Sequence, residues 1–146
     1  MKKPMIVLGA LTMMLMIATG TAVQAQESDE TLFVMITTGD AETQMMAMVL
    51  ATQSANQGAD VRILLCGDGG YLAVKGHEAP SFAPAGRTPV QLMAGLMERG
   101  ATVEVCGIFL PNRELTSDDL LDGVTAAAPP EVATFMRRPD VRLFTF

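Results

Sequence analysis

The stretch Val61-Arg62-Ile63-Leu64-Leu65-Cys66-Gly67-Asp68-Gly69 decides the fold, because a buried apolar run ends in a cysteine and a glycine turn. A second stretch, Thr102-Val103-Glu104-Val105-Cys106-Gly107, repeats this order of apolar run, cysteine and glycine. In an open parallel sheet, ligands and chemistry collect outside the carboxyl ends of the strands. The sequence therefore predicts that its only two thiols lie near the functional edge of a sheet.

The elements around these two runs predict an α/β fold. Apolar runs predict buried strands, and capping residues such as Asp40 and Thr88 predict where helices begin. The expected strands are Leu32–Ile36, Asp60–Cys66, Thr102–Cys106, a brief strand over 124–126, and Val141–Phe146; the expected helices are Ala41–Gln57, Thr88 to Gly100, Thr116 to Gly123 and Pro129–Arg138. Strands that alternate with helices indicate βαβ units with right-handed crossovers. We expect a three-layer α/β/α domain with a mainly parallel sheet of about five strands.

The first 25 residues have the pattern of a secretory signal peptide. Lys2 and Lys3 precede an uncharged apolar stretch, and Val23-Gln24-Ala25 places small residues at a cleavage site. The alternative, a membrane anchor, needs about 20 apolar residues, and this stretch is shorter. We expect cleavage after Ala25, a domain over 26–146, a periplasmic location and no membrane association afterwards.

The charge balance disfavours some partners. Two of the 10 basic residues lie in the expected signal peptide, which leaves 8 basic and 16 acidic residues in the remainder. A chain this acidic is poorly suited to bind nucleic acid or an anionic membrane surface.

One long irregular stretch, Gly67 to Arg87, directly follows Cys66. A loop of this length in a compact domain is usually functional or mobile. Its first glycines lack the spacing of a phosphate-binding loop, so a tight turn is the simpler interpretation. The substrate-binding candidates here are Asp68, Gly69, Tyr71 and Lys75. The single histidine, His77, has no nearby ligand pattern, and we expect neither a metal nor a cofactor.

A methionine-rich face of the first expected helix has two interpretations. Met45, Met46, Val49 and Leu50 share one broad face, which favours either core packing or a subunit interface. Because 49% of all residues are hydrophobic, we expect a homo-oligomer.

The two cysteines also have two interpretations. Cysteine is often a buried structural residue, and two thiols in an exported chain often form a disulfide. If their strands are neighbours, the spacing of about 4.8 Å between strands suits a bridge. The bridge would be either an added staple or a redox-active pair.

Several short segments resemble the DsrE/DsrF family, also called YchN-like. They are 99–106, 110–115, 120–124, 141–146 and the turn 68–73. The resemblance implies a three-layer α/β/α domain that assembles as trimers or hexamers. It also implies a persulfide-carrying cysteine just after the third main strand, where Cys106 stands. Cys66 and the signal peptide depart from the sulfur-relay members of that family.

We therefore expect a periplasmic protein that carries or transfers sulfane sulfur on Cys106. Cys66 would act as a resolving thiol or redox partner, and a sulfur donor or acceptor protein would be the partner. Whether such a carrier would count as an enzyme stays open. The alternative is a non-catalytic oligomeric module that binds a small ligand or a protein and has a structural Cys66–Cys106 disulfide.

Overall fold

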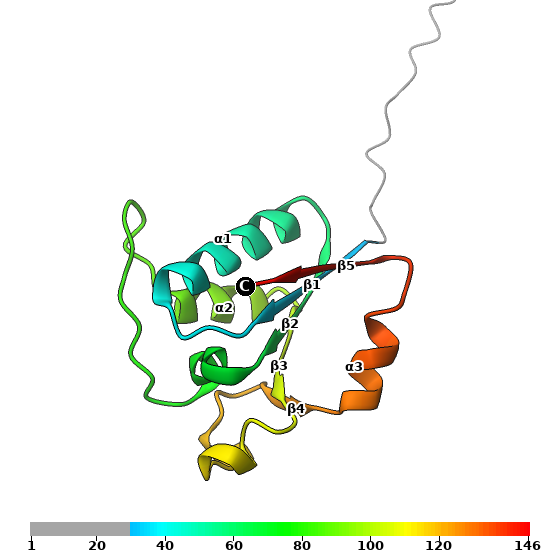
Figure 1. Ribbon diagram of the computed structural model, residues 1–146. Helices are drawn as coiled ribbons and strands as arrows, with labels where there is room; N and C mark the ends of the chain where they lie inside the picture. Colours follow the sequence, from blue (N-terminus) through cyan, green and yellow to red (C-terminus); the bar gives the residue numbers. More distant parts are fainter. Residues whose placement is uncertain (1–29) are drawn as a thin grey trace, which may run out of the picture.

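The computed structural model describes residues 30–146, which form a five-stranded parallel sheet covered by helices on both faces (Figure 1). The strands are β1 (Thr31–Ile36), β2 (Asp60–Leu65), β3 (Thr102–Cys106), β4 (Thr125–Ala127) and β5 (Val141–Thr145). Their order in the sheet is β4-β3-β2-β1-β5, and every pairing is parallel. The expected α/β class and strand number are confirmed.

Three α-helices make the outer layers. α1 (Ala41–Asn56) and α2 (Pro89–Met97) pack against each other on one face, and α3 (Pro129–Phe135) covers the other (Figure 1). Short 3-10 helices are η1 (Gly67–Ala73), η2 (Pro111–Arg113) and η3 (Ser117–Asp119). The helix expected from Thr116 to Gly123 is therefore limited to one 3-10 turn. Likewise, the stretch after Cys66 is more ordered than expected, because it begins with η1.

Side-chain caps fix the beginnings of the two longer helices. The Asp40 carboxylate accepts a hydrogen bond from the Thr43 N–H at 2.8 Å, at the start of α1. Thr88 and Gln91 form a reciprocal capping box at the start of α2. Such caps satisfy backbone N–H groups that have no partner within the helix.

The larger core lies between the sheet and the α1–α2 layer. Its fully buried side chains include Ile36, Ile63 and Val105 from the strands. From α1 the buried residues are Gln44, Ala47, Met48 and Ala51. Core packing of the face with Met46, Val49 and Leu50 is therefore wrong, because these side chains are exposed. A subunit interface remains the open alternative for them.

A smaller core lies between the sheet and α3. It contains Phe33, Leu64, Ala127 and Val132, and both cysteines pack against it. The Phe33 and Phe135 rings meet edge to face at 5.3 Å. This thin layer leaves the carboxyl end of the sheet only partly covered, and both cysteines are half-buried there.

The expected signal peptide and its cleavage site lie outside the described residues. Among residues 30–146, none of the helices combines the length and hydrophobicity that a membrane span requires.

Candidate functional site

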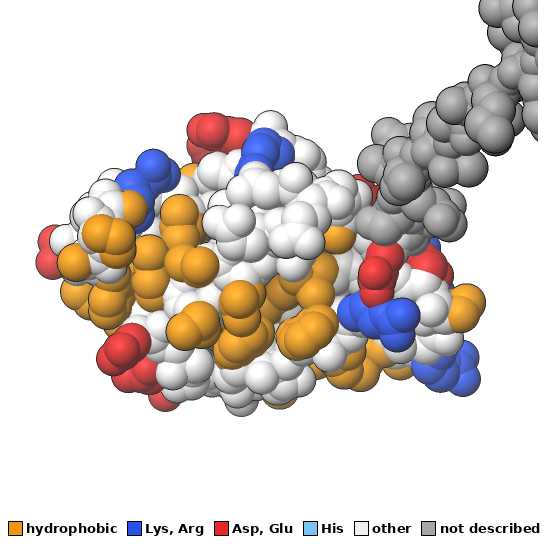
Figure 2. Space-filling model, turned by 90° about the horizontal axis from the view of Figure 1, so that it is seen from above, with side chains coloured by type: hydrophobic (Ala, Val, Ile, Leu, Met, Phe, Trp, Pro, Cys, Tyr) orange, Lys and Arg blue, Asp and Glu red, His pale blue; other side chains and the backbone are white. Residues whose placement is uncertain are grey.

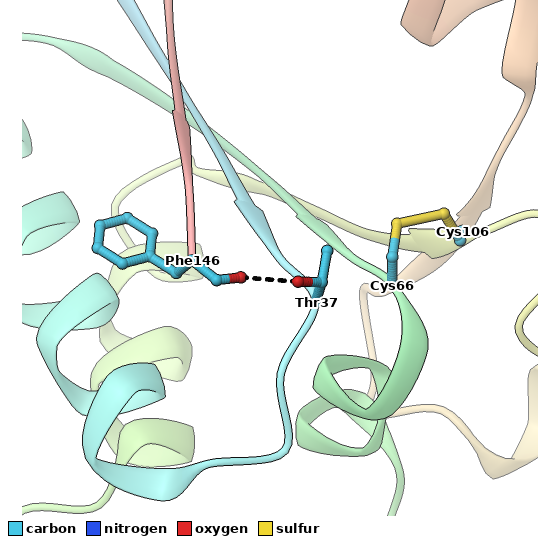
Figure 3. Close-up of a disulfide and its surroundings, with 4 residues drawn as sticks. All are labelled: Thr37, Cys66, Cys106 and Phe146. Carbon is cyan, nitrogen blue, oxygen red and sulfur yellow. Dashed lines mark hydrogen bonds between the residues drawn. A yellow bond between two sulfur atoms is a disulfide. The ribbon is translucent and has the colours of Figure 1, made fainter.

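A disulfide joins Cys66 and Cys106 at the carboxyl edge of the sheet (Figure 3). β2 and β3 are hydrogen-bonded neighbours, with Arg62 opposite Thr102 and Leu64 opposite Glu104. Continuing this register brings position 66 opposite position 106 on the same face, because side chains alternate with a period of two. The Cα atoms are 5.1 Å apart, within the range for a bridge. The predicted proximity of the two cysteines is confirmed, and the structure adds the bond.

The backbone is tightly packed beside each sulfur atom. A Cβ on Gly67 would lie 2.8 Å from the Thr37 carbonyl oxygen, and Gly67 has φ of +52°. A Cβ on Gly107 would lie 2.8 Å from the carbonyl oxygen of Ala127. Only glycine fits this approach without a backbone shift. The glycine after each cysteine therefore lets the chain turn closely around the bridge.

Thr37 lies at the same edge of the sheet, directly after β1, which neighbours β2 on the side opposite β3. Its N–H and its hydroxyl both donate to the Phe146 carbonyl oxygen, at 2.8 and 3.0 Å (Figure 3). The Cys66 N–H donates to the carbonyl oxygen of Ile36 at 2.8 Å. Sequence reasoning missed Thr37, although it follows the apolar run of β1 much as each cysteine ends its own run.

Arg113 links the segment after Cys66 to the segment after Cys106. Its guanidinium lies 3.1 Å from the Asp68 carboxylate. It also lies 4.6 Å from the centre of the Phe109 ring and 5.3 Å from that of Tyr71. The Tyr71 and Phe109 rings themselves meet edge to face at 5.6 Å. We call these four residues the Arg113 clamp.

Sequence reasoning missed Arg113 as a site residue. Its aromatic partners come from η1 and from the turn after β3, so nothing local in the sequence announces the contact. The Leu110–Leu115 segment entered only through the family resemblance. The tertiary structure alone brings the guanidinium to Asp68.

The predicted substrate-binding residues do not all lie together. Asp68 and Tyr71 belong to the Arg113 clamp. Gly69 is buried, and a Cβ there would lie 2.5 Å from the Ile36 carbonyl oxygen, so a larger residue would not fit without a backbone shift. Lys75 instead donates to the Asp118 carbonyl oxygen at 3.0 Å and lies 3.6 Å from the Asp122 carboxylate. His77 is exposed and stacks on Tyr71, with ring centres 6.4 Å apart.

No group of three or more His, Cys, Asp or Glu side chains within residues 30–146 is arranged to hold a metal ion. The Cys66–Cys106 disulfide is the candidate reactive group of this edge. As a disulfide it is an electrophile that a thiolate or a related sulfur nucleophile attacks. Once reduced, it supplies two thiols on neighbouring strands.

Three hollows of the surface have linings that do not include the cysteines. A shallow one of about 440 Å³ lies beside α3, where Arg62 and Phe135 line it. Another of about 400 Å³ is lined by residues at the amino ends of β1 and β2, among them Ala59. A smaller one of about 140 Å³ lies between α1 and β5, where Leu50 and Phe144 line it. Neither Cys66 nor Cys106 lines any of these hollows.

Comparisons with known proteins agree on one family. The model of the DsrE/DsrF-like family matches residues 30–146. An uncharacterised protein of Methanocaldococcus jannaschii is 31% identical over 94 residues, which are 64% of this chain and 79% of the relative. An uncharacterised protein of Methanopyrus kandleri is 28% identical over 101 residues, or 67% of this chain and 78% of the relative.

Two solved structures share the fold. The YchN protein of E. coli has a TM-score of 0.63 at 20% identity, covering 80% of this chain and 99% of YchN. A protein of unknown function from Methanobacterium thermoautotrophicum has a TM-score of 0.61 at 14% identity, covering 81% of this chain and 100% of its own. With the family match over the whole described region, these similarities show that the chain belongs to the DsrE/DsrF-like family.

Proposed function

We propose that this protein carries sulfane sulfur on Cys106, with Cys66 as the resolving thiol. The observation that supports this most is the Cys66–Cys106 pair at the carboxyl edge of the parallel sheet. The family is linked to sulfur relay. The family resemblance implies a sulfur-carrying cysteine at the end of the third strand, and Cys106 ends β3.

The transfer begins from the reduced protein. The Cys106 thiolate attacks the outer sulfur of a donor persulfide, which forms a Cys106 persulfide and releases the donor as a thiolate. An acceptor thiolate then attacks the outer sulfur and leaves Cys106 as a thiolate. If Cys66 attacks the inner sulfur first, the disulfide closes again and the outer sulfur leaves as sulfide. Cys66 thereby limits how long the persulfide persists.

Intact mass spectrometry tests this proposal. The reduced protein is incubated with glutathione persulfide, alkylated and weighed, beside Cys106→Ser and Cys66→Ser as matched variants. We expect one added sulfur on the wild type, none on Cys106→Ser, and a longer-lived adduct on Cys66→Ser. A wild-type protein that gains no sulfur while fully reduced would contradict the carrier.

A second candidate function is a non-catalytic module that binds a small ligand or a protein. The observation that favours it is that the bridge is formed and packs against the smaller core. A glutathione redox titration separates the two candidates. A bridge that stays closed at millimolar reduced glutathione favours the module, and one that opens there favours the carrier.

We further propose export to the periplasm and self-association. Export rests on the amino-terminal lysines and the apolar stretch that follows them, and self-association rests on the exposed apolar residues of α1. Sequencing the amino terminus of protein from a periplasmic extract should find Gln26 first. Retention of Met1 on a membrane-bound form would overturn the export proposal.

A further inference from the structure

We propose that the oxidised protein takes up sulfur directly from inorganic sulfide, which opens the Cys66–Cys106 disulfide. This inference rests on the proposed carrier function and names its substrate class. The carrier chemistry begins from thiols, but in this structure both cysteines are paired in the bridge. The bridge is an oxidant of two electrons that the protein itself holds.

The step balances without any other reactant. Hydrosulfide attacks Sγ of Cys106, a new sulfur–sulfur bond forms there, and the Cys66–Cys106 bond breaks. Cys66 leaves as a thiolate with the bonding electron pair, and the hydrosulfide proton is lost to solvent or taken up by that thiolate. The sulfide sulfur is oxidised to the sulfane level, and the disulfide is reduced to one thiol and one persulfide.

Local packing favours a small nucleophile. Both cysteines are half-buried, and the glycine after each one lies against a backbone carbonyl group. An attacking sulfur atom must approach along the axis of the sulfur–sulfur bond, so at a half-buried bridge a compact nucleophile meets fewer contacts than the thiol of a peptide. Sulfide is the smallest sulfur nucleophile, so it meets the least obstruction.

The charge near the bridge also favours sulfide as the attacking nucleophile. The described domain is acidic overall, which slows the approach of multiply charged anionic thiolates such as that of reduced glutathione. The acidic residue nearest to Cys66 in the chain is Asp68, and Arg113 neutralises it at 3.1 Å. Sulfide exists near neutral pH partly as uncharged hydrogen sulfide and partly as a monoanion, so repulsion is small.

The fold also keeps the opened cysteines together. β2 and β3 remain hydrogen-bonded neighbours, and the Arg113 clamp ties the segments that follow them. Cys66 therefore stays within reach of Cys106 after the bridge opens. Transfer of the outer sulfur to an acceptor leaves a dithiol, which a disulfide oxidant can close again by exchange.

The test uses the oxidised, untagged protein with no reductant present. Sodium sulfide is added anaerobically, the reaction is stopped with iodoacetamide, and intact mass and peptide maps are recorded over time. We expect one added sulfur on Cys106 and simple alkylation on Cys66. Opening by sulfide should be faster than opening by reduced glutathione at equal thiolate concentration.

Charge variants separate electrostatics from packing. Arg113→Ala should slow opening by sulfide about threefold at low salt, because Asp68 loses its partner. Arg113→Lys, or Asp68→Asn in the Arg113→Ala background, should restore the rate, and high salt should reduce the difference. Equal rates in all four proteins would show that Arg113 does not act through charge, which would overturn this part of the argument.

Failure of this inference is distinguishable from failure of the carrier. If the reduced protein gains sulfur from glutathione persulfide but sulfide does not open the disulfide, sulfide loading is wrong and the carrier proposal stands. Sulfur found on Cys66, or equally fast opening by glutathione, would also overturn the inference. If neither form gains sulfur, both proposals fail.

Discussion

Arg62 and Glu104 form a nearly buried ion pair on the face of the sheet that carries the disulfide. Arg62 Nη2 lies 2.7 Å from Glu104 Oε2, and the two side chains are only 15% and 11% exposed. The guanidinium also lies 4.4 Å from the centre of the Phe135 ring. Such a pair gains little over an apolar pair, but removing one partner leaves an uncompensated buried charge. The pair therefore orients α3 on the sheet through Phe135.

We predict that Glu104→Gln lowers the free energy of unfolding by roughly 3 kcal/mol, because Arg62 stays buried without a counter-charge. The double variant Arg62→Met with Glu104→Leu should recover most of that loss. Urea unfolding followed by circular dichroism measures both. A single variant as stable as the wild type would show that water compensates the charge.

Gly70 illustrates a second constraint at single-residue scale. A Cβ there would lie 2.2 Å from the Phe109 ring. Gly70→Ala should therefore destabilise the protein by about 1–3 kcal/mol and displace Phe109 from Arg113. Gly95→Ala is the matched control, because a Cβ there meets no atom within 4 Å. A similar urea midpoint for both variants would contradict the packing argument.

At the scale of elements, α1 depends on a charged cap at its amino end. Hydrogen bonds from the Thr43 side chain and then from its backbone N–H hold the pKa of Asp40 below its ordinary value of 3.8. A carboxyl group with a lowered pKa in the folded state stabilises the protein above its unfolded pKa. That contribution is lost as the pH falls from about 4 through the lowered folded-state pKa.

Asp40→Asn should therefore change the acid limb of the stability profile. The amide still accepts the Thr43 hydrogen bond but does not titrate. We expect wild type to be the more stable protein near neutral pH and the difference to shrink below about pH 4. Urea midpoints across this range measure it. A constant difference at every pH would exclude the charged cap as the cause.

At the scale of the whole molecule, the disulfide adds to a core that is complete without it. The larger cluster between the sheet and the α1–α2 layer draws most of its buried residues from β1, β2, β3, α1 and α2; both cysteines pack against the smaller cluster, and only Cys106 also borders the larger one. The bridge joins residues 40 apart in sequence. We expect Cys66→Ser and Cys106→Ser to stay folded and to lose roughly 3–4 kcal/mol, the loop-closure term for a loop of this length.

Far-ultraviolet circular dichroism and urea titration of both variants check this. Reduced wild type should match them within experimental error, since each lacks the same cross-link. A reduced protein that unfolds completely at room temperature would show that the domain needs its bridge to fold.

An exposed apolar band crosses the side of the molecule that carries α1 and β5 (Figure 2). Met46 is 55% exposed, Leu50 46% and Phe144 49%. β5 is also an edge strand, with an unpaired row of backbone groups. We propose that a second copy of the chain covers this band within a trimer or hexamer.

Leu50→Glu combined with Phe144→Glu should therefore dissociate the oligomer, because charged side chains would be buried at the contact. Light scattering at micromolar concentration measures the mass. Thr125→Glu on the opposite edge strand is the control and should leave the mass unchanged. A monomeric wild-type protein would overturn the proposal.

The strands, their alternation with helices in a parallel sheet, and the position of both cysteines at strand ends could all be predicted from the sequence. These features are local, since apolar runs, caps and glycines act within a few residues. The helix expected from Thr116 to Gly123 is wrong, because the capping box of Thr116 and Asp119 is followed by only a single 3-10 turn. The exposed face of α1 was ambiguous, because the same hydrophobic pattern suits a core and an interface.

The sulfur–sulfur bond, the Arg113 clamp and the Arg62–Glu104 pair became visible only once the chain was folded. Each joins residues about 40 positions or more apart. The bond depends on strand register, and a shift of one residue would turn one thiol to the opposite face. The contacts of Arg113 depend on how two separate turns meet above the sheet. Register and the meeting of turns are set by packing of the whole domain, which no local sequence pattern encodes.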